Sequence, residues 1–394
     1  MYNPVVILGA KRTPIDSFMG TFSSLSASDL GAIAIRAAVA ESAIDAARIE
    51  RAVMGCVLAA GQGQAPARQA AIKAGLPLAT GAVTVNKMCG SGMQAVMDVH
   101  DALVAQSVEI AVAGGMESMT GAPFLLPRHR QGQRMGHDEV KDSMFLDGLE
   151  DAYEPGKLMG AFVEAMAHEY QFTREAQDDY AIESLTRARQ ATASGAFAAE
   201  IAPVSVASRD GETTVTDDAR PGRAKPDRIR ALKPAFAPGG TITAANASSI
   251  SDGAAALVLC REEKATLTGA RPLARIAAHA TVAMEPAHFA VAPVPAIRTV
   301  LAKAGWEMND VDLFEVNEAF AAVAMIAMRD LGIVHEKLNV NGGACALGHP
   351  IGASGARIIV TLIEALRARR LRRGIASVCI GGGEATAIAL ELVK

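Results

Sequence analysis

The chain of 394 residues lacks the cysteine spacing of a disulfide framework or a zinc site. Its five cysteines are odd in number and widely separated, and no two of them form a CxxC motif. This usage fits a reducing compartment. The cysteines are Cys56, Cys89, Cys260, Cys345 and Cys379.

The sequence also lacks segments that would insert into or cross a membrane. No stretch approaches about 18 uninterrupted apolar residues, the length of a spanning helix. The N-terminal MYNPVVILGAKRTP has no basic region followed by an apolar stretch and a cleavage site. We therefore expect a cytoplasmic protein without a membrane partner.

No block of like charges is present, and the formal net charge is −4, so nucleic acid is not implied as a partner. A short basic run could still bind an anionic ligand, or it could be a solvated loop face, and both interpretations remain open. The run contains Arg220, Arg223, Lys225, Arg228 and Arg230.

What the chain does have is apolar content for a large core: half of its residues are hydrophobic, and its length suggests two or three domains. The predicted elements repeat in order, which favours two stacked α/β halves over chance similarity. The first half reads as strand 4–9, helix 29–43, strand and loop 49–61, then turn, helix and strand over 86–115. The second reads as strand 272–282, helix 295–305, strand and helix 311–322, then turn, helix and strand over 341–383.

A different stretch, 121–247, lies between the halves, and a run of this length in a compact protein is usually functional or covers a site. It contains an amphipathic helix at 173–190, and 241–260 then returns to a strand of the first half. We therefore expect domains at 1–120 plus 248–270, at 121–247 and at 271–394.

Cys89, in NKMCGSGMQA, precedes a helical run, so the helix dipole should favour its thiolate and lower its pKa. The alternative is a small buried residue at a strand–helix turn. His349, in GHPIGASGAR, precedes a second helix and is either a catalytic base or a structural histidine.

Cys379 ends a buried strand and is followed by three glycines, which suit a close backbone approach to a ligand. It could act as an acid or base beside an oxyanion-binding N–H of Gly381, or be a core cysteine. Asn317, in NEAFA, could position water or a carbonyl, or cap a helix.

Taken together, these strings resemble the thiolase family, specifically its biosynthetic acetyl-CoA acetyltransferase type. The resemblance covers essentially the whole chain, and AGGMESMT and TITAANASSISDGAAA add to it. It implies a five-layered αβαβα core built from two pseudo-symmetric halves, with an inserted loop domain that binds coenzyme A. It also implies that the substrates are coenzyme A thioesters and that no metal or prosthetic group is needed.

The resemblance further implies a role for each reactive residue. Cys89 would carry the acyl group and His349 would take its proton. Cys379 would remove the α-proton of the second acetyl-CoA. Asn317, through a water, and His349 would stabilise the enolate, and the N–H groups of Cys89 and Gly381 would form a second oxyanion hole.

The resemblance assigns residues that contact coenzyme A less directly than it assigns the catalytic roles. The matching positions are Leu149, Met159, Ala235, Phe236, Ala244, Ser248, Ile250, Phe289, Ala319 and Phe320, with Arg220 and Arg223 as the nearest phosphate-facing choices. The sequence departs from the acetoacetyl-CoA pattern at Leu158 and at Phe289-Ala290, which leaves strict two-carbon specificity open.

We therefore predict an acetyl-CoA C-acetyltransferase, with a broader-chain 3-ketoacyl-CoA thiolase of fatty-acid degradation as the alternative. A decarboxylating synthase is less favoured because Cys379 stands where a second histidine is usual. A scaffold that merely binds acyl-CoA is disfavoured because all reactive side chains are present. Residues 121–136 resemble the tetramer-forming stretch of relatives, so we expect a homotetramer, a dimer of dimers.

Overall fold

The computed structural model describes residues 4–208 and 211–393. Its strands are β1 (Val5–Arg12), β2 (Asp16–Ser17), β3 (Arg51–Gly55), β4 (Gly81–Val85), β5 (Ile110–Ser118), β6 (Phe124–Leu125), β7 (Lys141–Asp142), β8 (Val204–Ser208), β9 (Gly211–Val215), β10 (Ser251–Arg261), β11 (Ala274–Ala283), β12 (Leu313–Val316), β13 (Arg373–Ile380) and β14 (Glu384–Leu392). Its α-helices are α1 (Ala27–Ser42), α2 (Pro66–Lys73), α3 (Ser91–Val104), α4 (Met159–Glu169), α5 (Arg174–Ala193), α6 (Ala219–Arg223), α7 (Pro226–Ile229), α8 (Glu262–Thr268), α9 (Pro293–Ala304), α10 (Ala321–Leu331), α11 (Ala344–Leu347) and α12 (Ile351–Arg369).

The two halves have matching sheets. The first has the strand order β4-β3-β5-β10-β1, and the second has β12-β13-β14-β11. In both, a parallel pair (β3 with β5, and β12 with β13) is followed by antiparallel neighbours. A short antiparallel contact between β1 and β11 joins the sheets at one edge.

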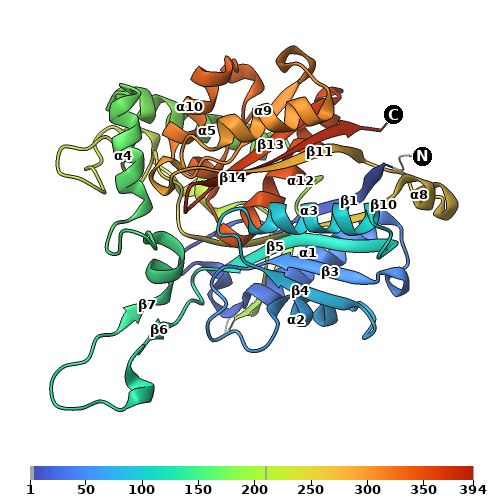
Figure 1. Ribbon diagram of the computed structural model, residues 1–394, viewed down its shortest axis with the longest axis horizontal. Helices are drawn as coiled ribbons and strands as arrows, with labels where there is room; N and C mark the ends of the chain where they lie inside the picture. The colour runs from blue at the N-terminus through green and yellow to red at the C-terminus, as the bar shows by residue number, and fades with distance from the viewer. Residues whose placement is uncertain (1–3, 209–210, 394) are drawn as a thin grey trace.

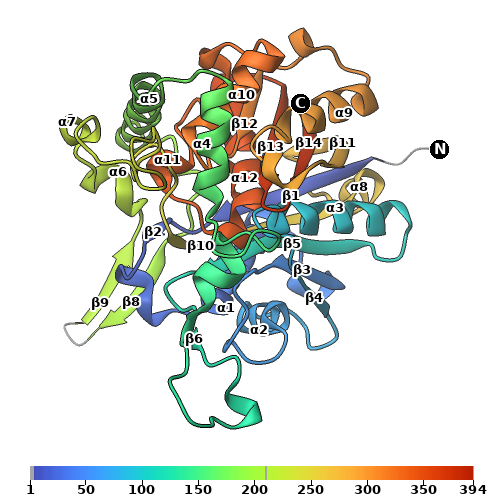
Figure 2. The same cartoon turned by 60° about the vertical axis from the view of Figure 1, so that its left-hand side comes forward.

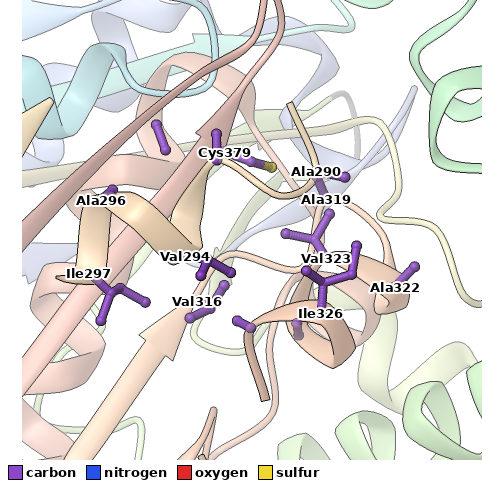
Figure 3. Packing of buried hydrophobic residues seen from close by; sticks show 14 of the residues in the cluster. Ala290, Val294, Ala296, Ile297, Val316, Ala319, Ala322, Val323, Ile326 and Cys379 are labelled. Atoms are coloured by element: carbon purple, nitrogen blue, oxygen red, sulfur yellow. The ribbon is translucent and has the colours of Figure 1, made fainter. Parts of the chain in front are cut away.

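The sheets and helices stack in five layers, as the resemblance to the thiolase family implied. Figure 1 shows α9 and α10 on the outer side of one sheet and α3 and α12 between the two sheets, and Figure 2 shows α1 and α2 together on the outer side of the other sheet. The hydrophobic core divides accordingly into two outer clusters and a central one, to which Met93 of α3 and Ile358 of α12 belong. Figure 3 shows part of one outer cluster, where Cys379 lies near residues of α9 and α10.

The central helices cross at glycines, and this contact brings their N-termini together. A Cβ on Gly355 of α12 would lie 2.6 Å from the main-chain nitrogen of Met93 in α3. A Cβ on Gly92 would lie 2.9 Å from the nitrogen of Ala356. Real Cβ atoms do not approach a main chain this closely, so glycine is required here. The residues just before α3 and α12 are Cys89-Gly90 and His349-Pro350.

The inserted stretch forms α4 to α7 and two hairpins. Figure 2 shows α5, α6, α7 and the β8–β9 hairpin gathered along one flank of the two halves. The β6–β7 hairpin projects away from the body (Figure 1). The predicted strand at 241–260 is wrong in its first part: β10 begins only at Ser251, and the loop before it lines a cavity. Within the described residues, no helix is both long and apolar enough to cross a membrane.

Candidate active site

Segments from both halves meet around one apolar cavity of about 560 Å³. Cys89 and His349 line it from the entrances of α3 and α12, and Gly381 lines it from the turn between β13 and β14. In that turn Gly382 and Gly383 have φ of +92° and +86°, a conformation that favours glycine. The glycines after Cys379 therefore form a tight hairpin that places the backbone at the cavity wall.

Cys89 is half-buried, and its sulfur accepts hydrogen bonds from two main-chain N–H groups, its own and that of Gly381. Burial nevertheless raises the pKa of the Cys89 thiol to about 11, against the lowering effect of those two donors. The expectation of a lowered pKa is therefore wrong, because the loss of hydration outweighs the helix dipole. Met88, the preceding residue, has a φ of +47°, which costs about 1 kcal/mol and turns the chain toward the cavity.

His349 is buried, and its hydrogen bonds define its tautomer. Its Nδ1 lies 2.6 Å from Oγ of Ser354, whose hydroxyl donates to the Pro350 carbonyl at 2.9 Å. Since the hydroxyl proton is used on that carbonyl, the imidazole donates through Nδ1 and carries a lone pair on Nε2. Nε2 has no partner among the described residues. Burial, with the charge of Arg357, lowers the pKa of His349 to about 3, so the ring is neutral.

Asn317 lies behind His349 and does not line the cavity. Its Nδ2 is 3.4 Å from Nδ1 of His349, and its Oδ1 accepts from Nη2 of Arg357 at 3.4 Å. The alternative interpretation of Asn317 as a helix cap is wrong, because Phe320 is the residue that precedes α10.

Cys379 is also behind the cavity wall, with 1% of its surface exposed. Burial raises the pKa of its thiol well above the usual value, and the neighbouring Cys89 raises it further. The influence of Cys89 on the pKa of the Cys379 thiol reflects the proximity of the two sulfurs. Both sulfurs are therefore protonated in the resting protein.

Most residues that the resemblance implied for coenzyme contacts line the same cavity. These are Leu149, Met159, Arg220, Ala235, Phe236, Ala244, Ser248, Ile250, Phe289, Ala319 and Phe320. Arg223 does not line it. It lines an adjoining cavity of about 330 Å³ together with Lys225 and Arg228, and Arg220 and Ala244 border both. An apolar cavity thus continues into a basic one.

Sequence reasoning missed two residues that hold the site together. Ser354 fixes the histidine tautomer, and its signal was a hydroxyl in the first turn of the helix that follows the histidine. Glu117 is fully buried, and its carboxylate accepts from the N–H groups of Val57, Leu58 and Gly352 at 2.8 to 3.1 Å. The Glu117 carboxylate joins the start of α12 to the first half. No local sequence pattern predicts this contact.

Comparison with known proteins agrees with this arrangement. Residues 5–263 match the family model of the thiolase N-terminal domain, and residues 270–392 match that of the thiolase C-terminal domain. The chain belongs to the thiolase family.

Relatives of this thiolase include the acetyl-CoA acetyltransferase of Cupriavidus necator, 46% identical over 98% of this chain and 99% of the relative. The acetyl-CoA acetyltransferase of Escherichia coli is 47% identical over 98% of both chains. Among solved structures, the acetyl-CoA acetyltransferase of Bacillus anthracis superposes with a TM-score of 0.97 at 38% identity, covering 100% of this chain and 99% of that one. A thiolase of Ascaris suum in complex with coenzyme A has a TM-score of 0.93 at 41% identity, covering 99% and 100%.

Proposed function

We propose that this thiolase is an acetyl-CoA C-acetyltransferase. It would join two acetyl-CoA molecules into acetoacetyl-CoA and free coenzyme A, and catalyse the reverse thiolysis. The observation that carries the proposal is that Cys89, His349 and Gly381 line one apolar cavity that opens beside a basic one. The names of the full-length relatives favour this activity over a broader-chain thiolase of fatty-acid degradation.

In the first half-reaction, Sγ of Cys89 attacks the thioester carbon of acetyl-CoA. The resting pair is a neutral thiol and a neutral imidazole, so the thiol proton passes to Nε2 of His349 as the S–C bond forms. The N–H groups of Cys89 and Gly381 stabilise the oxyanion of the tetrahedral intermediate. Coenzyme A leaves as its thiol after taking that proton, and the acetyl group remains on Cys89.

In the second half-reaction, the Cys379 thiol first passes its proton to the His349 imidazole, and the resulting thiolate removes a proton from the methyl group of a second acetyl-CoA. His349 and Asn317, the latter through a water, stabilise the enolate oxygen. The enolate carbon attacks the acetyl carbon on Cys89, a C–C bond forms and the S–C bond breaks. The proton held by His349 returns to the Cys89 thiolate and Cys379 keeps the proton that it removed, so the two thiols and the neutral imidazole are restored.

We propose that the apolar cavity takes the pantetheine arm and that the adjoining basic cavity takes the phosphates. Arg220 borders both, and Arg223, Lys225 and Arg228 line the basic one. Because these charges would meet the ligand far from the reacting carbon, they contribute uniform binding. Replacing Arg223 by Glu should therefore raise KM for acetyl-CoA about tenfold with little change in kcat. An equal fall in kcat would contradict this placement.

Incubation with acetyl-CoA alone tests the chemistry. Peptide mass spectrometry should find one acetyl group, on Cys89, and Cys89→Ala should abolish it. Cys379→Ala should still form the acetyl-enzyme but lose condensation and thiolysis by at least a hundredfold. Acetylation at another residue, or unchanged condensation in the Cys379 variant, would overturn the assignment. Thiolysis of 3-ketoacyl-CoA substrates of increasing length should fall beyond acetoacetyl-CoA.

We also propose that the protein is a cytoplasmic homotetramer that docks through the β6–β7 hairpin. Phe124 and Met135 in this hairpin are 69% and 105% exposed, an apolar surface that an assembly would cover. The domains would be 1–120 with 248–270, 121–247 and 271–394. Light scattering should give four chains per particle, and shortening residues 126–139 should reduce this to two.

A further inference from the structure

A second cluster of chemically reactive side chains lies away from the active site. His100 and Asp101 lie near the C-terminal end of α3, and His279 lies on β11 of the other half. One atom of each meets the others: Nε2 of His279 is 3.1 Å from Nδ1 of His100 and 2.9 Å from Oδ1 of Asp101. Nδ1 of His100 is 3.0 Å from the same Oδ1. Within the described ranges, this is the single group of three such donors.

Hydrogen bonds alone cannot make all three contacts among these atoms favourable. A carboxylate only accepts, so protons for the three contacts come from the two imidazole nitrogens, each of which supplies at most one. At least one contact therefore brings two lone pairs, or two N–H groups, toward each other. A single cation placed against the three atoms would use all three lone pairs at once.

The spacing fits one face of a metal coordination sphere. In a six-coordinate octahedral complex, neighbouring ligand atoms about 2.1 Å from the metal are at right angles and lie about 3.0 Å apart. The observed edges of 2.9, 3.0 and 3.1 Å match this value. The two rings stand at 83° to each other, so both nitrogens can aim at a common point. We propose that His100, Asp101 and His279 form a binding site for a divalent transition metal in six-coordinate geometry, such as Co²⁺ or Zn²⁺ with water at the remaining positions.

The surroundings suit such an ion. Asp101 is 65% exposed at its side chain, which leaves the remaining coordination positions open to water. Lys303 is a nearby cation, and its Nζ donates to the His279 carbonyl oxygen and not to the ligand atoms. Two imidazoles with one carboxylate favour Zn²⁺ or Co²⁺ over Mg²⁺ or Ca²⁺, which prefer oxygen.

The site would tie the two halves together without entering the reaction. His100 is eleven residues along the chain from Cys89, about 16 Å at 1.5 Å per residue. A bound ion would therefore fix the far end of the helix that carries the nucleophile, against a strand of the other sheet. We expect stabilisation and no change in the chemical steps.

The experiment uses the full-length protein after removal of metals with EDTA. Titration with Co²⁺ should give one visible d–d spectrum per chain without the near-ultraviolet band of cobalt–thiolate bonds, which separates this site from the active-site sulfurs. Saturating Zn²⁺ should raise the unfolding temperature by about 2 °C or more. His279→Gln and the surface variant Asp101→Asn should each weaken Co²⁺ binding at least tenfold.

His288→Gln is the matched control, because His288 also faces a carboxylate, that of Glu285 at 3.4 Å, but the part of the chain that the structure describes places no third donor beside them. It should bind Co²⁺ as the parent does. Equal Co²⁺ binding by His279→Gln, or a spectrum dominated by thiolate bonds, would overturn the proposal. Acetyl-enzyme formation by Asp101→Asn should match the parent, which confirms that the variant is folded and leaves the proposed function a separate question.

Discussion

At the residue scale, burial sets the charge of each reacting group. A helix N-terminus stabilises an anion by about 0.3–1 kcal/mol when exposed, whereas burial shifts a pKa by up to several units. At Cys89 the second effect is larger, and the pKa rises to about 11. At His349 it lowers the pKa to about 3. Cys89 and His349, the proposed nucleophile and base, are therefore both uncharged in the free protein, and charge develops only when substrate is bound.

This neutral pair predicts a steep pH dependence for alkylation of Cys89 in the free protein. The thiolate reacts with iodoacetamide, and its population grows tenfold per pH unit below the thiol pKa. The rate at Cys89, followed by peptide mapping, should therefore rise without a plateau between pH 7 and pH 9. A plateau beginning near pH 6 would mean a stable thiolate–imidazolium pair and contradict the assignment. Cys89→Ser identifies the label that belongs to this site.

Ser354 should control the reactivity of His349 through Nδ1. Without the hydroxyl, the tautomer with the lone pair on Nε2 loses a hydrogen bond worth about 1 kcal/mol. Ser354→Ala should lower kcat about tenfold or more with little change in KM, and Ser354→Thr should restore most of it. The pH profile should shift as well, since the Nδ1 partner helps set the imidazole pKa. An alanine variant with the parent kcat and pH profile would make Ser354 a packing residue.

Local sequence singled out Cys89 and His349, which line one cavity, but not the ionisation of either side chain. Cys89, His349 and Cys379 stand out because glycines flank them, and such flanking is visible in the chain itself. The raised thiol pKa depends on the side chains that close around Cys89 from distant segments. The cluster of His100 with His279 is likewise invisible in the sequence, because the two are brought together only by the stacking of the halves.

At the scale of elements, the crossing of α3 and α12 positions the nucleophile and the base. The helices touch through main-chain atoms at Gly92 and Gly355, so no side chain separates them. Each helix then presents its N-terminus to the same cavity, with Cys89 before one and His349 before the other. The distance between the reacting groups therefore depends on how closely these two helices pack.

Widening this crossing should damage both stability and activity. In Gly355→Val the new Cβ would lie 2.6 Å from the nitrogen of Met93, so the helices must separate. Overpacking of this kind costs about 1–3 kcal/mol. Urea unfolding should show this loss, and acetyl-enzyme formation should slow at least tenfold. Gly222→Ala is the control, because a Cβ there meets nothing within 4 Å. A Gly355→Val variant with the parent midpoint would contradict the close crossing.

The repeated order of elements was predictable because both halves alternate strands and helices with glycine-rich turns. The residue at which β10 begins was not predictable from the sequence. Residues 241–250 have strand-like composition, but Thr241 and Ile242 donate their N–H groups to the Glu164 carboxylate and not to a sheet neighbour. Glu164 lies in α4 of the inserted stretch. The local sequence around residues 241–250 does not indicate a hydrogen bond to a residue so far away along the chain.

At the scale of the whole molecule, a buried ion-pair network joins the inserted stretch to the core. Arg12 of β1 pairs with Glu200 at 2.5 Å and with Asp218 at 2.7 Å, and all these side chains are fully buried. Thr361 of α12 also donates to Glu200, at 3.1 Å. β1, the inserted stretch and α12 are therefore joined by one set of buried ion pairs and hydrogen bonds. If one of these parts moved away, buried charged groups of the others would lose their partners.

Removing Arg12 should uncouple this network in a pH-dependent way. Arg12→Ala leaves Glu200 and Asp218 buried without the cation that pairs with both of them, at a cost of about 3–5 kcal/mol near pH 8. Burial already raises the pKa of Glu200 against the opposing charge of Arg12, and it rises further without Arg12. A carboxyl group with a raised folded-state pKa takes up protons on folding, so the penalty should shrink by about 1 kcal/mol or more from pH 8 to pH 5. Urea midpoints at both pH values measure this change in the penalty.

Arg230→Ala is the control. It removes an exposed pair with Asp179 and should change the free energy of unfolding by less than about 1 kcal/mol at either pH. A penalty for Arg12→Ala that is equal at the two pH values would show that packing, and not charge, holds the inserted stretch to the core.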